Sequence, residues 1–358
     1  MNVTVVGSGN GGLATAFDFA LHGHTVRLFD TAHFPDHVAE VADAGGIRAT
    51  GEIEGFAEIA YSGHDVQEAL EGAELVILVG PAYSTEHQAS VVAAHLVPGQ
   101  AVLVCPASCA GAITFKRTAG LALDDETITV GETSTLPYAV RIVAPGQINV
   151  FHKLHGGVFV AGLPRSGTER LLSMIRDVYP GAEAAGGVLQ TTLQNGNPVI
   201  HPAVTLLNTG LIDRTAGAFL FYEEGVTEAV GRAIEAVDRE RLAIAEALDV
   251  PVLSEPDLGV LQGYMLEANY STGYSTAPGF LGIGAQSRLD HRYLTEDVGY
   301  SLVFLTDLAG RVGVETPTMQ ALITMASVVL ARDLRAEGAR TLGTLGLDGM
   351  SASDLAAL

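Results

Sequence analysis

The feature that most constrains the fold is a glycine-rich turn close to the start of the chain. Residues 3–6 form a short apolar run that predicts a buried strand, and residues 12–22 carry apolar side chains at helical spacing. The segment between them, Gly7-Ser8-Gly9-Asn10-Gly11-Gly12, fits the pattern G-x-G-x-x-G. A strand, this turn and a helix in that order are typical of the first unit of a dinucleotide-binding α/β sheet.

Each glycine of the turn has a distinct expected role. Gly7 allows the tight turn, Gly9 lets the backbone approach a pyrophosphate, and Gly12 lets the helix pack close to the strand. The backbone N–H groups at the helix N-terminus, including those of Asn10 and Gly11, would hold the phosphates. We therefore expect all five residues to bind a dinucleotide cofactor.

Two further positions are candidates for cofactor contacts. The apolar run 25–29 ends at Asp30, 18 residues beyond Gly12, where a carboxylate can accept both ribose hydroxyls of NAD and repel a 2′-phosphate. No Arg or Lys lies between residues 31 and 47 to bind that phosphate, so NAD (NADH) is expected and NADP is disfavoured. Pro81 follows the apolar run 75–79. Pro81 either contacts the cofactor or belongs to an ordinary turn between a strand and a helix. Asp30 has a similar alternative, as an acidic turn residue that binds no ligand.

The first half of the chain alternates strands and helices. Expected strands cover residues 3–6, 25–29, 75–79, 101–105, 127–130, 147–151 and 158–161, and expected helices cover 12–22, 84–95 and 169–178. Such alternation indicates a Rossmann-type, doubly wound α/β sheet. We place this domain at residues 1–186.

The second half is rich in Ala and Leu and has few internal prolines. It predicts long helices at residues 197–214, 228–248, 296–312 and 318–335, and hence an all-α C-terminal domain at 187–358. No flexible linker separates the two halves, so we expect a ligand-binding cleft between two docked domains.

Composition excludes several classes of partner. The net charge of −22 argues against nucleic acids and anionic membranes. We expect neither a leader peptide nor a membrane-spanning segment, since the first residues lead directly into a strand and no apolar stretch is long enough to span a membrane. The two cysteines, Cys105 and Cys109, are too few for a disulfide framework or a zinc site. We expect a cytoplasmic protein with small-molecule substrates and no metal ligands. A homodimer is compatible with the sequence.

Three residues of the second half are candidates for chemistry. His201 lies at the start of the first long helix, and histidine can donate and accept protons near neutral pH. Asp297 could hold its tautomer, and Arg292 could bind a substrate carboxylate in bidentate fashion. The alternative is purely structural: a helix-start histidine, with Glu296 and Asp297 as first-turn acids behind an N-cap at Thr295.

Six blocks of the sequence resemble the opine dehydrogenases, the octopine/nopaline-type family that includes the bacterial N-(1-carboxyethyl)-norvaline type. The blocks are Gly7-Ser8-Gly9-Asn10-Gly11-Gly12, Gly131-Glu132-Thr133-Ser134, Asn197-Pro198-Val199-Ile200-His201-Pro202, Phe221-Tyr222-Glu223-Glu224-Gly225, Asp238-Arg239-Glu240-Arg241 and Arg292-Tyr293-Leu294-Thr295-Glu296-Asp297. The resemblance spans nearly the whole chain. It implies an NADH-dependent reductive condensation, in which an amino acid and a 2-oxo acid form an imine that accepts hydride. It also implies that His201 is the general acid/base, Asp297 its partner and Arg292 the carboxylate anchor.

Two other functions stay open at this stage. A ketopantoate-reductase-like or 2-hydroxyacid dehydrogenase would reduce a carbonyl on the same fold, but such reductases use a lysine near the start of the helical domain. No lysine follows Lys153 in this chain. A non-catalytic NAD-binding sensor is the second alternative, and the joint presence of His201, Asp297 and Arg292 argues against it.

Overall fold

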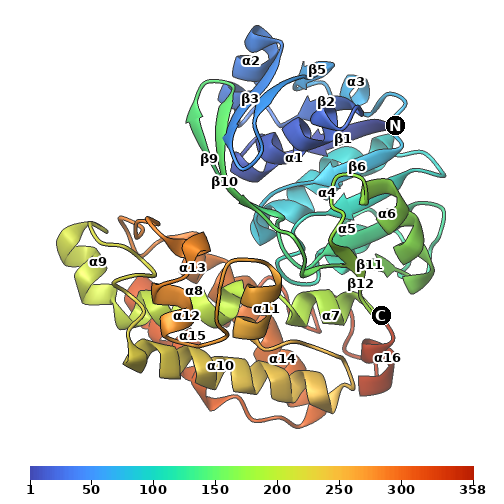
Figure 1. The fold of residues 1–358 in the computed structure, drawn as a ribbon. Helices are drawn as coiled ribbons and strands as arrows, with labels where there is room; N and C mark the ends of the chain where they lie inside the picture. Colours follow the sequence, from blue (N-terminus) through green and yellow to red (C-terminus); the bar gives the residue numbers. More distant parts are fainter. The chain divides into compact units, whose positions relative to one another are not determined.

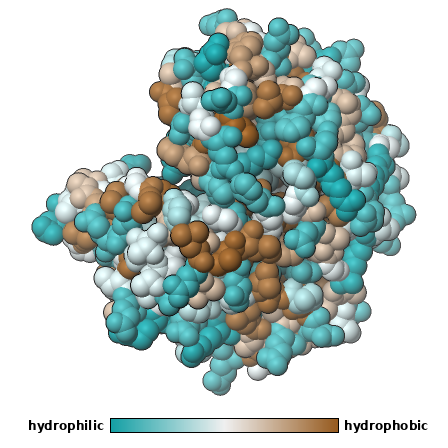
Figure 2. Space-filling view, in the orientation of Figure 1, coloured by the Kyte–Doolittle hydropathy of each residue, from teal (hydrophilic) through white to brown (hydrophobic).

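The computed structural model describes residues 1–358, which form two compact units, Met1–Thr191 and Thr192–Leu358 (Figure 1). Helix α7 (Val188–Leu193) crosses the junction between them. The domain limits 1–186 and 187–358 stay a prediction. Hydrophilic side chains cover much of the face drawn in Figure 2, interrupted by small hydrophobic areas. No helix of either unit combines the length and the apolar character that crossing a membrane requires.

The first unit is built on an eight-stranded sheet with the order β12-β11-β8-β7-β6-β1-β2-β5. Its strands are β1 (Asn2–Val6), β2 (Thr25–Phe29), β5 (Tyr61–Gly63), β6 (Leu75–Leu78), β7 (Ala101–Val104), β8 (Thr129–Thr133), β11 (Val158–Leu163) and β12 (Ala182–Ala184). All neighbouring pairs are parallel except β8 with β11. The expected doubly wound sheet is confirmed. Its order reverses between β1 and β6, which is where ligands bind in such sheets.

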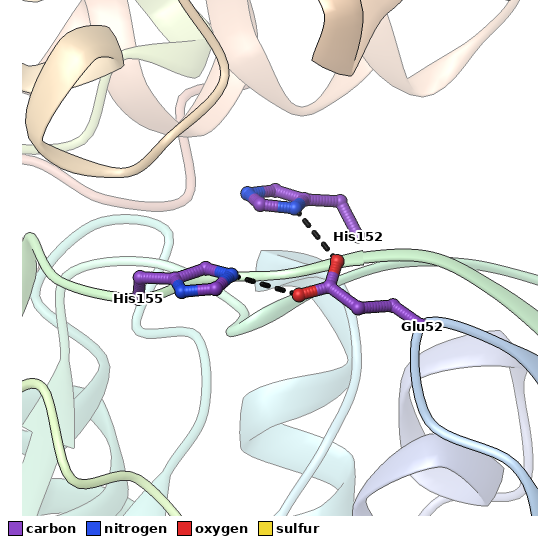
Figure 3. Close-up of side chains that lie close together, drawn as sticks. All are labelled: Glu52, His152 and His155. Atoms are coloured by element: carbon purple, nitrogen blue, oxygen red, sulfur yellow. Dashed lines mark hydrogen bonds and ion pairs between the residues drawn. The ribbon is translucent and has the colours of Figure 1, made fainter.

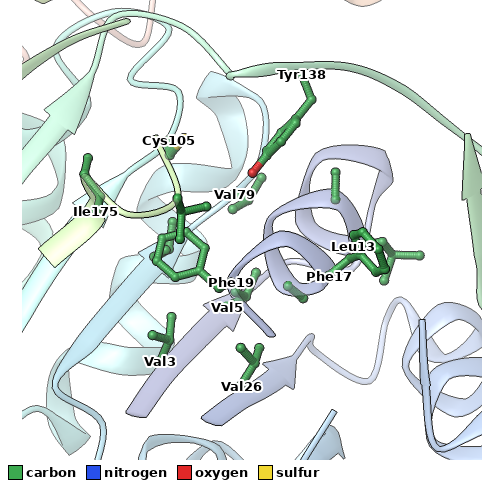
Figure 4. Packing of buried hydrophobic residues seen from close by; sticks show 14 of the residues in the cluster. Val3, Val5, Leu13, Phe17, Phe19, Val26, Val79, Cys105, Tyr138 and Ile175 are labelled. Atoms are coloured by element: carbon green, nitrogen blue, oxygen red, sulfur yellow. The ribbon is translucent and has the colours of Figure 1, made fainter. Parts of the chain in front are cut away.

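Helices flank this sheet. They are α1 (Asn10–Leu21), α2 (Pro35–Ala44), α3 (Val66–Leu70), α4 (Thr85–Val92), α5 (Gly111–Thr118) and α6 (Thr168–Ile175). Every side chain of β6 and β7 is buried, which explains why these strands are uninterrupted runs of Val, Leu, Ile and Ala. In Figure 4, Phe19 of α1 lies close to Val5 of the strand beneath, whereas Phe17 lies beside Leu13 of the same helix. All four belong to one buried cluster.

A second, four-stranded sheet lies against α1, with the order β4-β3-β10-β9. Its strands are β3 (Gly46–Gly51), β4 (Gly55–Glu58), β9 (Tyr138–Ala144) and β10 (Gln147–Lys153). Its inner side chains, among them Ile47, Val140 and Ile148, belong to the same buried cluster as Phe17. The sequence indicates a strand at 147–151 but not the separate sheet to which this strand belongs.

The second unit is helical, and a single bridge between Leu220 and Gly284 is its only β-pairing. Its helices are α8 (Asn197–Leu207), α9 (Thr209–Thr215), α10 (Glu228–Ala247), α11 (Glu255–Leu261), α12 (Thr272–Ser275), α13 (Arg292–Thr295), the π-helix η5 (Asp297–Leu302), α14 (Val303–Val312), α15 (Pro317–Leu330) and α16 (Ala352–Ala356). The all-α architecture is confirmed, with two corrections. The segment 197–214 is two helices because the Asn208 side chain donates to the carbonyls of Val204 and Gly225 and ends α8. The segment 296–312 begins as a π-helix.

Candidate active site

The glycine turn lies between β1 and α1, and two of its glycines are required by close backbone contacts. A Cβ at Gly7 would lie 2.1 Å from the carbonyl oxygen of Val79, and a Cβ at Gly12 would lie 1.8 Å from the carbonyl oxygen of Gly7. Gly7 also has a φ of +110°, which side chains rarely allow. These contacts keep the turn tight and α1 close to the sheet.

Gly9 differs from both, because a Cβ there would meet nothing within 4 Å. Gly9 is also the N-cap of α1, and no side chain accepts a hydrogen bond from the first turn of this helix. The positive end of α1 thus has no side-chain cap and has room beside Gly9, which suits the binding of phosphate groups. The turn fits a dinucleotide pyrophosphate.

The other two predicted residues of the turn contact the second sheet. The side-chain Oδ1 of Asn10 accepts a hydrogen bond from the backbone N of Ile142 in β9, at 2.7 Å. A Cβ at Gly11 would lie 2.9 Å from a methyl carbon of Leu136. The side-chain oxygen of Asn10 is therefore taken up by the second sheet, which leaves its side-chain NH2 and its backbone N–H as donors for a phosphate. Gly11 is small because Leu136 packs against it.

Asp30 lies at the end of β2 and is held beside the turn. Its Oδ2 accepts hydrogen bonds from the backbone N and the hydroxyl of Ser8, both at 2.7 Å, and its Oδ1 accepts one from Thr31 N at 2.8 Å. Pro81 follows β6, the neighbour of β1, and precedes the short 3₁₀ helix Ala82–Ser84. Both residues thus lie at the carboxyl edge of the sheet, and their cofactor contacts stay predictions.

In the second unit, His201 of α8 and Asp297 are brought together across 96 residues of sequence. Nδ1 of His201 lies 2.8 Å from Oδ2 of Asp297, and both side chains are buried. Nε2 of His201 lies 3.1 Å from the hydroxyl of Tyr222. The ring of Tyr293 stacks on the imidazole, with the ring centres 3.8 Å apart.

These contacts assign a tautomer to His201. An ionised carboxylate can only accept hydrogen bonds, so Nδ1–H donates to Asp297 and leaves the lone pair of Nε2 as an acceptor. The Tyr222 hydroxyl supplies the matching donor. Burial, followed by the neighbouring Tyr293 hydroxyl, raises the pKa of Tyr222 well above its ordinary value, so this phenol stays protonated. The geometry provides a basic nitrogen that can exchange a proton with a bound molecule.

The local structure around Asp297 differs from the expected helix start. Thr295 is the last residue of the single-turn helix α13, its hydroxyl donates to the carbonyl of His291, and the N-cap of that helix is His291. The N-cap assigned to Thr295 is therefore wrong, because the helical turn begins four residues earlier than the apolar pattern indicates. Asp297 is the first residue of the π-helix η5. Helical segments with such wider turns are often found at functional sites.

Arg292 is the first residue of α13 and lies next to Tyr293 in the sequence. Its side chain is 47% exposed, and its Nε lies 3.8 Å from Oε2 of Glu296. An ion pair this long and this exposed contributes little to stability. Its role as a carboxylate anchor stays a prediction.

Several residues of this site carry no role in the sequence analysis. Tyr222 stacks on Phe280, which stacks in turn on Tyr264, so an aromatic wall continues from His201. Glu255 is buried, its Oε2 lacks a hydrogen-bond partner, and burial and then Asp238 raise its pKa well above the ordinary value. The blocks containing Tyr222 and Tyr293 contribute to the family resemblance, but nothing local in them indicates contact with His201.

Comparisons with known proteins agree with this arrangement. The family model described as NAD/NADP octopine/nopaline dehydrogenase, alpha-helical domain, matches residues 184–330. The opine dehydrogenase of Arthrobacter sp. (strain 1C) is 34% identical over 352 residues, which cover 98% of this chain and 96% of that protein. The chain belongs to the opine dehydrogenase family. It is accordingly an NAD-dependent dehydrogenase that acts on CH–NH bonds.

Solved structures show the same fold at low sequence identity. An octopine dehydrogenase with NADH and L-arginine has a TM-score of 0.80 at 18% identity, covering 100% of this chain and 98% of that one. The same type of enzyme with NADH and pyruvate has a TM-score of 0.75 at 20% identity, covering 97% and 98%. The fold of this chain is therefore that of octopine dehydrogenase over nearly its whole length.

Proposed function

We propose that this opine dehydrogenase joins the amine of an amino acid to a 2-oxo acid, with NADH as the reductant and His201 as the general acid/base. The observation that carries the proposal is the buried pair of His201 and Asp297. In this pair Nε2 of His201 keeps its lone pair, which accepts a hydrogen bond from the neutral hydroxyl of Tyr222. Bound NADH supplies the hydride. Family membership supports the reaction class, and the glycine turn and Asp30 support the cofactor.

The proton movements follow from this tautomer. An amino acid reacts as its neutral amine, so Nε2 of His201 accepts the proton that the ammonium group loses. Addition to the oxo carbon and transfer of a proton from nitrogen to oxygen give a neutral carbinolamine. The same histidine nitrogen then returns its proton to the hydroxyl, which leaves as water, and the protonated imine (iminium) that accepts hydride is formed. Asp297 stabilises the intermediate imidazolium, as a carboxylate does beside a catalytic histidine. Arg292 would bind a carboxylate of the substrates.

The test is a substrate panel with this protein and NADH. We expect NADH oxidation only when pyruvate and an amino acid are both present, with arginine and norvaline among the amino acids tried. Oxidation with the oxo acid alone would indicate a hydroxyacid dehydrogenase. Binding of NADH without turnover under every condition would indicate a sensor. Either result overturns the proposal.

We also propose that Asp30 sets the preference for NAD over NADP. The Asp30→Asn variant removes the negative charge and keeps the size of the side chain, although its NH2 group cannot accept the hydrogen bond now made to one of the carboxylate oxygens. It should raise the ratio of kcat/KM for NADPH over NADH about tenfold or more, equivalent to about 1.4 kcal/mol. Steady-state rates with both cofactors measure this ratio. The Asp36→Asn variant, an acid in the first turn of α2, is the matched control and should leave the ratio unchanged. An equal ratio in Asp30→Asn and the unaltered protein would refute the assignment.

We further propose the class of substrate and the cellular location. Small-molecule substrates follow from the reaction class. A cytoplasmic location is supported by Cys105 and Cys109, which are both buried free thiols.

A further inference from the structure

Three metal-ligating side chains meet at one end of the second sheet (Figure 3). Glu52 follows β3, His152 lies in β10, and His155 lies two residues beyond that strand. Oε2 of Glu52 is 2.8 Å from Nδ1 of His152, and Oε1 is 2.8 Å from Nε2 of His155. One possible ligand atom from each residue lies within 4.8 Å of the other two.

The backbone holds this group in place. Gly51 adopts a φ of +100°, and a Cβ there would lie 2.1 Å from the carbonyl oxygen of Val150, so the chain passes close to β10 just before Glu52. Glu52 N donates to that same carbonyl at 2.9 Å. Lys153 N donates to Oε2 of Glu52 at 2.9 Å. The register of β10 shifts between Val150 and His152, as at β-bulges that redirect a side chain.

We propose that Glu52, His152 and His155 bind one divalent transition-metal ion such as Zn²⁺. Imidazole nitrogen and carboxylate oxygen are common zinc ligands at about 2.0–2.2 Å. Two such ligands in tetrahedral geometry lie roughly 3.3 Å apart. The two 2.8 Å pairs would have to open by about 0.5 Å, and the two imidazole nitrogens, which lie within 4.8 Å of each other, would have to reach the same separation. Water would complete the coordination.

The charges at the site suit a cation. Burial raises the pKa of Glu52, but hydrogen bonds from Lys153 N and the two imidazoles outweigh this effect, so its pKa lies below the ordinary value and the carboxylate is ionised. The ammonium group of Lys153 does not compete, since its Nζ is 2.7 Å from Oδ2 of Asp18. When the ion binds, the N–H protons now shared with Glu52 move to the other ring nitrogens or to solvent.

We propose a structural role for this site. None of its three residues belongs to the glycine turn or to the histidine pair. Because they come from β3 and β10, or directly after them, a bound ion joins the ends of two strands that are about a hundred residues apart in sequence. An ion that binds only the folded chain raises its stability.

The test uses the untagged full chain, stripped with a chelator and titrated with Zn²⁺ by calorimetry and by thermal unfolding. We expect one ion per chain and a higher Tm when Zn²⁺ is present. The variants Glu52→Gln and His155→Gln should each weaken binding about tenfold or more and abolish the Tm rise. The His155 side chain is 71% exposed, so its replacement should leave the metal-free protein folded, which its metal-free Tm checks.

A matched control is available in the same unit. Nδ1 of His37 lies 3.0 Å from Oε2 of Glu40, a similar pair that lacks a third ligand. The His37→Gln variant should bind Zn²⁺ as the unaltered chain does. Absence of stoichiometric binding, or binding that is equally strong in Glu52→Gln and His155→Gln, would overturn the proposal and leave a hydrogen-bonded cluster only.

Discussion

Replacement of His201 with alanine should lower kcat/KM for the condensation about 10²- to 10⁴-fold, the usual contribution of a positioned general acid/base. The loss arises because Nε2 is the only basic nitrogen that the Asp297 contact orients in this site. Binding of NADH, followed by the fluorescence of the reduced nicotinamide, should be unchanged, because the cofactor contacts predicted from the sequence lie in the first unit.

Two variants separate a chemical role of His201 from a structural one. Asp297→Asn keeps the size of the partner but can stabilise the wrong imidazole tautomer, so it should also lower kcat while the protein stays folded. His95→Ala changes an exposed histidine and should have the activity of the unaltered enzyme. If His201→Ala oxidised NADH at the normal rate in the presence of both substrates, the mechanism would be wrong.

Gly12→Ala and Gly9→Ala should fail in different ways. The added Cβ at Gly12 would lie 1.8 Å from the carbonyl oxygen of Gly7, so α1 has to move from the sheet, at a cost of about 3 kcal/mol or more in the free energy of unfolding. At Gly9 the Cβ meets nothing within 4 Å, and φ is −72°, so the free energy of unfolding should change by no more than about 0.5 kcal/mol.

The same Gly9 variant should nevertheless bind NADH about tenfold more weakly or worse, because its methyl group projects where the pyrophosphate is expected to approach the backbone. Urea unfolding gives the stability of both variants, and a fluorescence titration gives their affinity for NADH. Normal NADH affinity in Gly9→Ala would place the phosphates elsewhere. Normal stability in Gly12→Ala would show that α1 adjusts at little cost.

Features encoded in contiguous sequence could be predicted. The strand before Gly7 and the helix after it, the buried runs that became β6 and β7, and the helical second half all follow from local periodicity and turn chemistry. The doubly wound fold follows from their order, because parallel strands require crossover connections.

Features that depend on distant partners could not be predicted. Strand β3 pairs with β10, about a hundred residues later, and short strands of mixed polarity give no signal for such pairing. The contact of His201 with Asp297 was a hypothesis that spacing alone did not support, and Tyr222 had no predicted role at all. The π-helix at Asp297 could not be predicted either, since the six residues Asp297–Leu302 are too few for a wider turn to be recognised in the apolar pattern.

The hydrogen bond between Asn10 and Ile142 joins the second sheet to the turn that is expected to bind the cofactor. The turn is held from outside by a strand that follows it by more than a hundred residues. Coupling of this kind is reciprocal. If a bound dinucleotide stabilises the position of that strand, the strand in its place raises the affinity for the dinucleotide by the same free energy. A substitution in β9 that disturbs this hydrogen bond is therefore expected to lower the affinity for the dinucleotide as well as the stability of the fold.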